Sequence, residues 1–238
     1  MKKILMIIFS LSAAFSAFAS DIDTANPNFE LNRIMGTLNT TPYLTFTCNY
    51  YTEKLDSSGL KRDSVMGWFK LNGKKFSSKR DSTTLIQNSF YCLSINKRDS
   101  FMLVSRTQDI YTSIFGFNLL ESTLQRSYIS GVTMSDSSTQ RKMTYSLKSY
   151  APYTLVEICY DTTTYFPKYV TYKMKMYGQG VVLPGFYLQV TAKFSGFTTN
   201  SFTDAAFDTS PYINRLNGVY TAVVPFNNFR LYDQTLNP

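Results

Sequence analysis

From residue 43 onward, apolar and polar side chains alternate along the chain with a period of two. Such alternation is typical of a β-strand that buries one face and exposes the other. The clearest strands are predicted over residues 65–72, 91–95, 142–148, 170–176 and 186–195. Neighbouring strands are separated by short, turn-like connections at residues 71–74, 97–100 and 161–164. The pattern therefore predicts an antiparallel meander of many strands.

Two segments depart from this alternation and predict helices. The first has Asn26 as a cap, Pro27 in the first turn and Glu30 near the positive end of the helix dipole, and it ends near residues 39–42. Its apolar stripe consists of Leu31, Ile34, Met35 and Leu38.

The second predicted helix covers residues 108–126, where Ile110, Tyr111, Ile114, Phe115, Phe117, Leu119, Leu120 and Leu124 form a wide stripe. Two roles remain open for it, an ordinary core element against one face of the sheet or a movable lid. After the last long strand, residues 212–233 predict a final strand or hairpin around Asn217 and Gly218.

The N-terminus has the pattern of a secretory signal peptide. Lys2 and Lys3 precede an apolar run over residues 4–18, and small residues at Ala17 and Ala19 favour cleavage after Ala19. As a membrane span the run is short, since a bilayer needs about 20 apolar residues. We therefore expect residues 1–19 to be removed and residues 20–238 to form one soluble periplasmic domain, with no lipid anchor and no transmembrane helix.

The net charge of +8 becomes +8 − 2 = +6 without Lys2 and Lys3. The basic residues form short clusters at strand edges and turns, where they discourage pairing between sheets. A nucleic-acid-binding stripe would be denser, so we expect no nucleic-acid partner. A basic exported surface could approach an anionic membrane.

Cys48, Cys92 and Cys159 are an odd number of cysteines without a CxxC motif, so at most one disulfide can form. All three lie within strand-like runs, which favours buried, apolar thiols.

The chain lacks the residue types and motifs that the commonest catalytic sites use. The chain has no histidine, which removes the commonest general base, the Ser-His and Cys-His pairs and the usual zinc ligand. No GxSxG motif or phosphate-binding glycine loop is present. We assign no catalytic residue, no metal and no cofactor, and expect a protein that is not an enzyme.

Aromatic side chains are abundant instead, with 18 Tyr and 19 Phe beside 9 Met. They are consistent with a well-filled core and equally with an apolar cavity for acyl chains.

Four stretches together resemble the LolA-type family of periplasmic lipoprotein carriers, which includes LolB- and RseB-like proteins. Residues 63–76 (DSVMGWFKLNGKKF) resemble its glycine, aromatic strand, short turn and basic-Phe strand start, and residues 84–96 (TLIQNSFYCLSIN) its next hairpin. Residues 156–173 are similar to a later hairpin, and residues 222–233 to the ending of a divergent branch of larger exported proteins. The resemblance implies a mainly β (α+β) fold, a strongly curved antiparallel sheet forming an incomplete β-barrel capped by one or two helices.

The resemblance also implies a carrier or sensor that shelters lipid or lipoprotein acyl chains in an apolar concave cavity. We expect this cavity to be lined by Trp68, Phe69, Leu71, Tyr91, Leu93, Phe115, Leu119 and Tyr145. The alternative is an envelope protein–protein interaction module on the same fold, because Lys70 and Leu71 stand where the carriers have an arginine. The partners would be lipid or acyl chains, or envelope membrane proteins, and the protein would act as a monomer.

Overall fold

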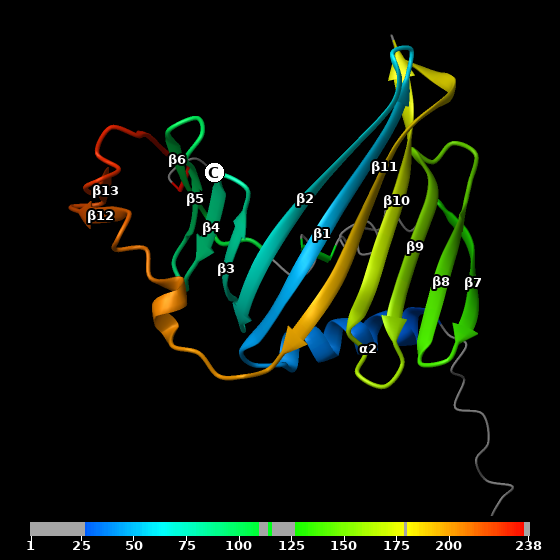
Figure 1. Cartoon of the computed structure of the whole chain (residues 1–238), viewed down its shortest axis with the longest axis horizontal. Coiled ribbons are helices and arrows are strands. Elements are labelled where there is room, and N and C mark those ends of the chain that lie inside the picture. The colour runs from blue at the N-terminus through cyan, green and yellow to red at the C-terminus, as the bar shows by residue number, and fades with distance from the viewer. Residues whose placement is uncertain (1–26, 110–113, 116–126, 179, 236–238) are drawn as a thin grey trace, which may run out of the picture.

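One large, curved β-sheet crossed by a helix forms the molecule, as the computed structural model shows (Figure 1). The structure describes residues 27–109, 114–115, 127–178 and 180–235. The predicted signal peptide and most of the second predicted helix lie outside these residues. Among the described helices, none is long and apolar enough to cross a membrane.

Twelve strands follow one another in the sheet in the order β14-β6-β5-β4-β3-β2-β1-β11-β10-β9-β8-β7. Their bounds are β1 (Leu44–Asp56), β2 (Gly59–Asn72), β3 (Lys75–Arg80), β4 (Thr83–Gln87), β5 (Cys92–Asn96), β6 (Phe101–Ser105), β7 (Ile129–Ser137), β8 (Gln140–Leu147), β9 (Tyr153–Asp161), β10 (Pro167–Gly178), β11 (Val181–Thr198) and β14 (Arg230–Asp233). All neighbouring pairs are antiparallel except β14 and β6, which run parallel. The outermost strands β14 and β7 do not pair with each other, so the sheet is an incomplete barrel, as predicted.

The turns follow the local sequence. Gly73 has a φ of 58° and begins the two-residue connection between β2 and β3. A separate hairpin joins β12 (Ile213–Leu216) to β13 (Val219–Ala222), and its turn residues Asn217 and Gly218 have φ angles of 50° and 84°. Two consecutive positive φ angles are required by a tight I′ turn, which Asn-Gly adopts readily. This confirms the predicted final hairpin.

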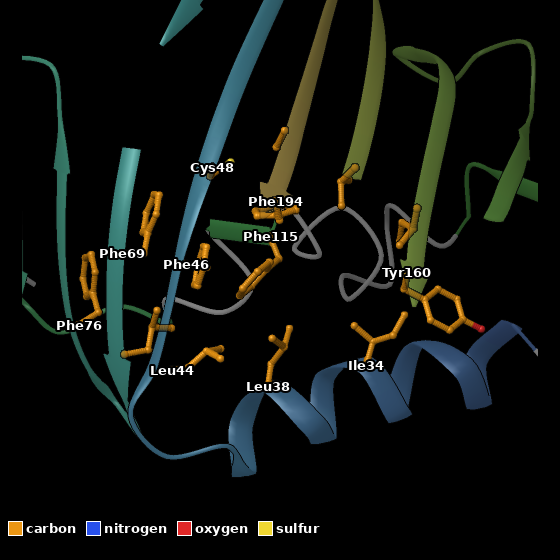
Figure 2. Packing of buried hydrophobic residues seen from close by; sticks show 14 of the residues in the cluster. Ile34, Leu38, Leu44, Phe46, Cys48, Phe69, Phe76, Phe115, Tyr160 and Phe194 are labelled. Carbon is orange, nitrogen blue, oxygen red and sulfur yellow. The ribbon is translucent and has the colours of Figure 1, made fainter. Parts of the chain in front are cut away.

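The helix α2 (Pro27–Thr40) confirms the first helical prediction. It crosses one end of the central strands, and Ile34 and Leu38 point from it into the concave side of the sheet (Figure 2). Both side chains are fully buried there.

Of the second predicted helix, the structure describes four residues. Ile114 and Phe115 are in helical conformation, and Phe115 is buried. Gln108 and Asp109 are not helical, so the predicted start at residue 108 is wrong, because the Gln108 backbone is bonded to the Gln87 side chain instead.

The main core lies on the concave face, where alternate residues of the strands point inward. On β1 these are Leu44, Phe46 and Cys48, while Thr45 and Thr47 point outward. The register places Phe46 opposite Phe69 of β2, so both side chains pack in the core on the concave face. The concave core consists of Ile34, Leu38, Leu44, Phe46, Cys48, Phe69, Leu71, Phe76, Cys92, Phe115, Met143, Tyr145, Val156, Ile158, Tyr160, Val170, Ala192 and Phe194.

A second core lies on the opposite face of β4, β5 and β6. Ile86, Leu93 and Val104 are consecutive cross-strand partners, and they alternate with the residues that face the concave side. The hairpin β12–β13 covers them, with Ile213 and Tyr220 buried in the same cluster. The apolar side of the sheet therefore changes from the concave to the convex face between the central strands and β4–β6.

A buried polar network attaches α2 to the far strands. Tyr160 Oη of β9 donates a hydrogen bond to Glu30 Oε2, and Arg141 Nη1 of β8 lies 3.4 Å from Glu30 Oε1. Arg141 also forms a two-point contact with Asp136, with donor–acceptor distances of 2.6 and 2.8 Å. Burial, reinforced by the bond to Glu30, raises the pKa of Tyr160, which therefore stays protonated as a donor.

Replacing Tyr160 with Phe should lower the free energy of unfolding by about 1–3 kcal/mol, because the buried Glu30 carboxylate loses its hydroxyl donor. Urea denaturation followed by circular dichroism would measure the loss. The matched control is Tyr150→Phe at an exposed tyrosine, which should change stability by less than about 0.5 kcal/mol. Equal losses in the two variants would contradict the role of the network.

Candidate functional site

A cavity of about 160 Å³ opens on the concave face beside the main core. Strands β1 to β4 form its walls together with Gln108 and Ile114. Its apolar wall consists of Phe69, Phe76, Leu85 and Ile114, and its polar wall of Tyr50, Ser78, Arg80, Thr83 and Gln108. Ser78 lies opposite Phe69 on β2 and Leu85 on β4, so an occupant of this space meets both apolar and polar side chains.

An aromatic cluster adjoins this cavity, centred on Phe46 (Figure 2). The Phe46 ring stacks on Phe69 at 5.0 Å and on Phe197 at 5.1 Å, measured between ring centroids. Phe115 lies 5.3 Å from Phe46 and 5.0 Å from Phe194. Phe115 therefore occupies part of the concave face with a side chain of the protein itself.

The rim of the cavity carries a positive charge. Arg80 is exposed, and its guanidinium carbon lies 5.5 Å from the ring centroid of Tyr50. Among the described residues, no carboxylate lies within ion-pair distance of Arg80. Burial raises the pKa of Tyr50, so its hydroxyl stays neutral beside this charge.

Gln87 anchors the start of the segment that leads to Ile114. Its side chain is fully buried. Nε2 donates to the carbonyls of Lys74 and Gln108 at 2.9 and 3.0 Å, and Oε1 accepts from the Gln108 backbone N–H at 2.9 Å. The three bonds attach Gln108, at the polar wall of the cavity, to β4 and to the β2–β3 turn.

Beyond the core, the concave face continues as an apolar surface along the long strands. Val190 pairs with Tyr172, and Leu188 pairs with Met174, across β11 and β10. These four side chains are half-buried, as is Val65 on β2. Together with the cavity, this surface is the candidate site.

The structure brings four of the eight expected lining residues together on the concave face: Phe69, Leu71, Phe115 and Tyr145. Three others lie on the convex side. Trp68 is 53% exposed there, and Leu93 and Tyr91 belong to the second core, where Tyr91 packs on Tyr220 at 5.2 Å. Leu119 lies outside the described residues.

Several lining residues were not predicted from the sequence: Tyr50, Phe76, Ser78, Arg80, Leu85 and Gln108. For two of them a signal existed, because Phe76 and Ser78 alternate with outward-facing residues on β3. Adjacent strands extend the same face across the sheet, so the pairing of β3 with β4 and of β2 with β1 would have located Leu85 and Tyr50. Gln108 lies outside the strands and has no such signal.

The three cysteines are free and buried, as the sequence favoured. Burial raises the pKa of the Cys48 thiol to about 12 and that of Cys92 to about 11, and it also raises the pKa of Cys159. In the described part of the chain, no group of three or more His, Cys, Asp or Glu side chains is placed to hold a metal ion.

No protein-family model and no curated protein matches this chain. Solved structures do match it, at low identity. An uncharacterized conserved protein from Thermus thermophilus is 9% identical, with a TM-score of 0.44, and the match covers 87% of this chain and 98% of that one.

A LolA superfamily protein from Nitrosomonas europaea, from the family that the sequence resembles, is also 9% identical, with a TM-score of 0.37 and coverages of 75% and 97%. A DUF1329 family protein from Desulfovibrio piger is 11% identical, with a TM-score of 0.36 and coverages of 76% and 95%. Because these TM-scores are low, we base the function on the geometry of the chain itself.

The buried thiols should not react in the native protein, because the thiolate is the reactive form. We expect an aromatic disulfide reagent at about pH 8 to label less than one thiol per native chain and all three in denaturant. Rapid labelling of the native protein would contradict the burial, and labelling of one thiol in denaturant would indicate a disulfide.

Proposed function

We propose that the protein is a non-catalytic periplasmic carrier or sensor that binds lipid or acyl chains on the concave face of its sheet. The observation that carries the proposal is a cavity on the concave face, lined in part by apolar side chains, with an exposed arginine at its rim that no carboxylate of the described residues pairs with. An acyl methylene gains about 0.8 kcal/mol when it leaves water for such a surface. The predicted signal peptide would deliver the protein, as a monomer, to the compartment where lipoprotein acyl chains need shelter.

The size of the cavity limits how much of a chain it can hold. About 160 Å³ is close to the volume of an engineered apolar cavity that binds benzene. A few methylene groups therefore fit inside it, and the rest of an acyl chain would stay outside the cavity. This arrangement suits one chain better than a multi-chain lipid.

Arg80 places a positive charge at one end of the proposed site. The guanidinium at the rim is placed to meet a carboxylate or phosphate while the hydrocarbon lies against Phe69, Phe76 and Leu85. Guanidinium groups pair well with both kinds of anion. The proposed ligand is thus an amphiphile with an anionic group and one apolar chain.

The second candidate is an envelope protein–protein interaction module on the same fold. Two observations favour it: the cavity is smaller than the roughly 300–1,000 Å³ of usual ligand pockets, and Phe115 already fills part of the concave face. Native mass spectrometry of the mature protein discriminates the two, because a carrier should retain a lipid of the host cell and an interaction module should be empty.

Filling the cavity should weaken acyl binding. Ser78 is buried in its wall, so Ser78→Leu would displace about two methylene groups of a bound chain and reduce palmitate affinity about tenfold. The neighbouring Ser77 faces the other side of β3, and Ser77→Leu should leave the affinity unchanged. Titration with a fluorescent fatty acid would measure both, and equal affinities in the two variants would contradict the site.

Removing the charge at the rim should affect anionic ligands selectively. Arg80→Gln should weaken palmitate binding about two- to fivefold, the effect of an exposed ion pair, and should not alter the binding of hexadecanol. The control Arg98→Gln removes an exposed arginine that pairs with Asp81. A parallel loss for acid and alcohol would show that Arg80 acts through packing instead of charge.

A further inference from the structure

The convex face carries a second surface with a different composition. A groove of about 320 Å³ crosses β1, β2 and β3 on this side, and Trp68 lies in it, 53% exposed. Trp68 pairs with Thr47 of β1 and Lys79 of β3. The groove is bordered by Thr45, Thr47, Lys70, Ser77, Lys79 and Gly196.

Apolar exposure extends from this groove along the neighbouring strands. Met66 lies two residues before Trp68 on β2 and is 44% exposed, and Tyr51 on β1 is 42% exposed. All three point away from the concave core, because they alternate with the buried residues of their strands. We call Trp68, Met66 and Tyr51 the convex apolar row.

Three lysines lie beside the convex apolar row. Lys70 and Lys79 border the groove of Trp68, and Lys193 Nζ lies 5.1 Å from the ring centroid of Tyr51. Within the described residues, none of these three lysines forms an ion pair, whereas Lys54, Lys75, Lys142 and Lys168 each do. The convex apolar row is therefore flanked by positive charge that no carboxylate of the described residues neutralises.

We propose that this convex surface docks on the headgroups of an anionic lipid bilayer. Tryptophan and tyrosine are enriched where membrane meets water, and the surface of an anionic bilayer attracts lysines that lie within a Debye length. The net charge of +6 that remains without Lys2 and Lys3 also favours an anionic partner. A nucleic acid would require a denser basic stripe, and an acidic peptide would not need the row of exposed apolar side chains.

Docking on this face leaves the concave site turned away from the bilayer, because Trp68 and Phe69 point to opposite sides of β2. The inference therefore does not depend on acyl binding.

The test uses the mature protein and two kinds of vesicle, phosphatidylcholine alone and phosphatidylcholine with about one third phosphatidylglycerol. We expect co-sedimentation with the anionic vesicles, weakened by salt, and little with the neutral ones. Trp68 is the only tryptophan, so its emission should shift to shorter wavelength on binding. Absence of binding at low salt, or binding without a spectral shift, would overturn the proposal.

Charge variants locate the contact. Each lysine near an anionic surface accounts for about a fivefold change in affinity, so Lys70→Gln, Lys79→Gln and Lys193→Gln combined should weaken vesicle binding about a hundredfold. The control combines Lys61→Gln, Lys74→Gln and Lys97→Gln, three exposed lysines outside the groove, with the same change in net charge. Equal weakening in both sets would show that total charge, and not this surface, governs binding.

Palmitate titration of the same variants separates this inference from the proposed function. The convex variants should bind palmitate with unchanged affinity. Loss of vesicle binding with intact palmitate binding, or the reverse for Ser78→Leu, would show that the two surfaces act independently.

Discussion

The packing of aromatic rings around Phe46 is the interaction on which the rest of the structure depends. Phe46 contacts Phe69 of β2, Phe194 and Phe197 of β11, and Phe115. Each such ring pair contributes about 0.5–1.5 kcal/mol beyond the burial of its area. The rings converge on one side of three adjacent strands, with Ile34 and Leu38 of α2 beside them (Figure 2). They therefore form the core on the concave side of the curved sheet.

The same sheet has to bury apolar residues on both sides, in different places. At β1 and β2 the concave face is apolar, whereas at β4, β5 and β6 the buried residues Ile86, Leu93 and Val104 point the other way. The cavity lies where this change occurs, bounded by Phe69 and Phe76 on one side and by Leu85 and Thr83 on the other. Between the central core and the second core, the concave face is thus only partly filled by the described side chains.

Most of the fold could be predicted from local sequence, and the site could be predicted only in part. The helix α2, the alternating strands and the Asn217–Gly218 turn depend on residues close together in the chain. Glu30 shows the limit: its position near the helix N-terminus suggested a dipole partner, yet it is buried against Tyr160, 130 residues away. A contact of that separation leaves no local signal.

The residues of the candidate site were harder to predict from the sequence than the elements of the fold. Trp68 and Phe69 are neighbours on one strand, and successive side chains of a strand point to opposite faces, so the two side chains could not both point into the concave cavity. The alternation around Leu93 predicted a strand with one buried face, but it could not predict which side of the sheet that face is on. The buried face changes sides at β4–β6 because the hairpin β12–β13 covers it, and this hairpin comes more than 100 residues later in the chain. Arg80 follows Phe76 and Ser78 in the alternation of β3, but an exposed arginine at a strand end indicates no binding role until its neighbours in the fold are known.

The two proposed surfaces lie back to back on β2, and this constrains how they can work together. Hydrogen-bonded strands leave no passage through a sheet, so a chain leaving a bilayer under Trp68 would have to travel round an edge to reach Phe69. The sheet has two such edges, β7 and β14, because it does not close. A protein held by its convex face would therefore present an accessible concave site to a partner on the side away from the membrane, and loading and docking would be separate steps.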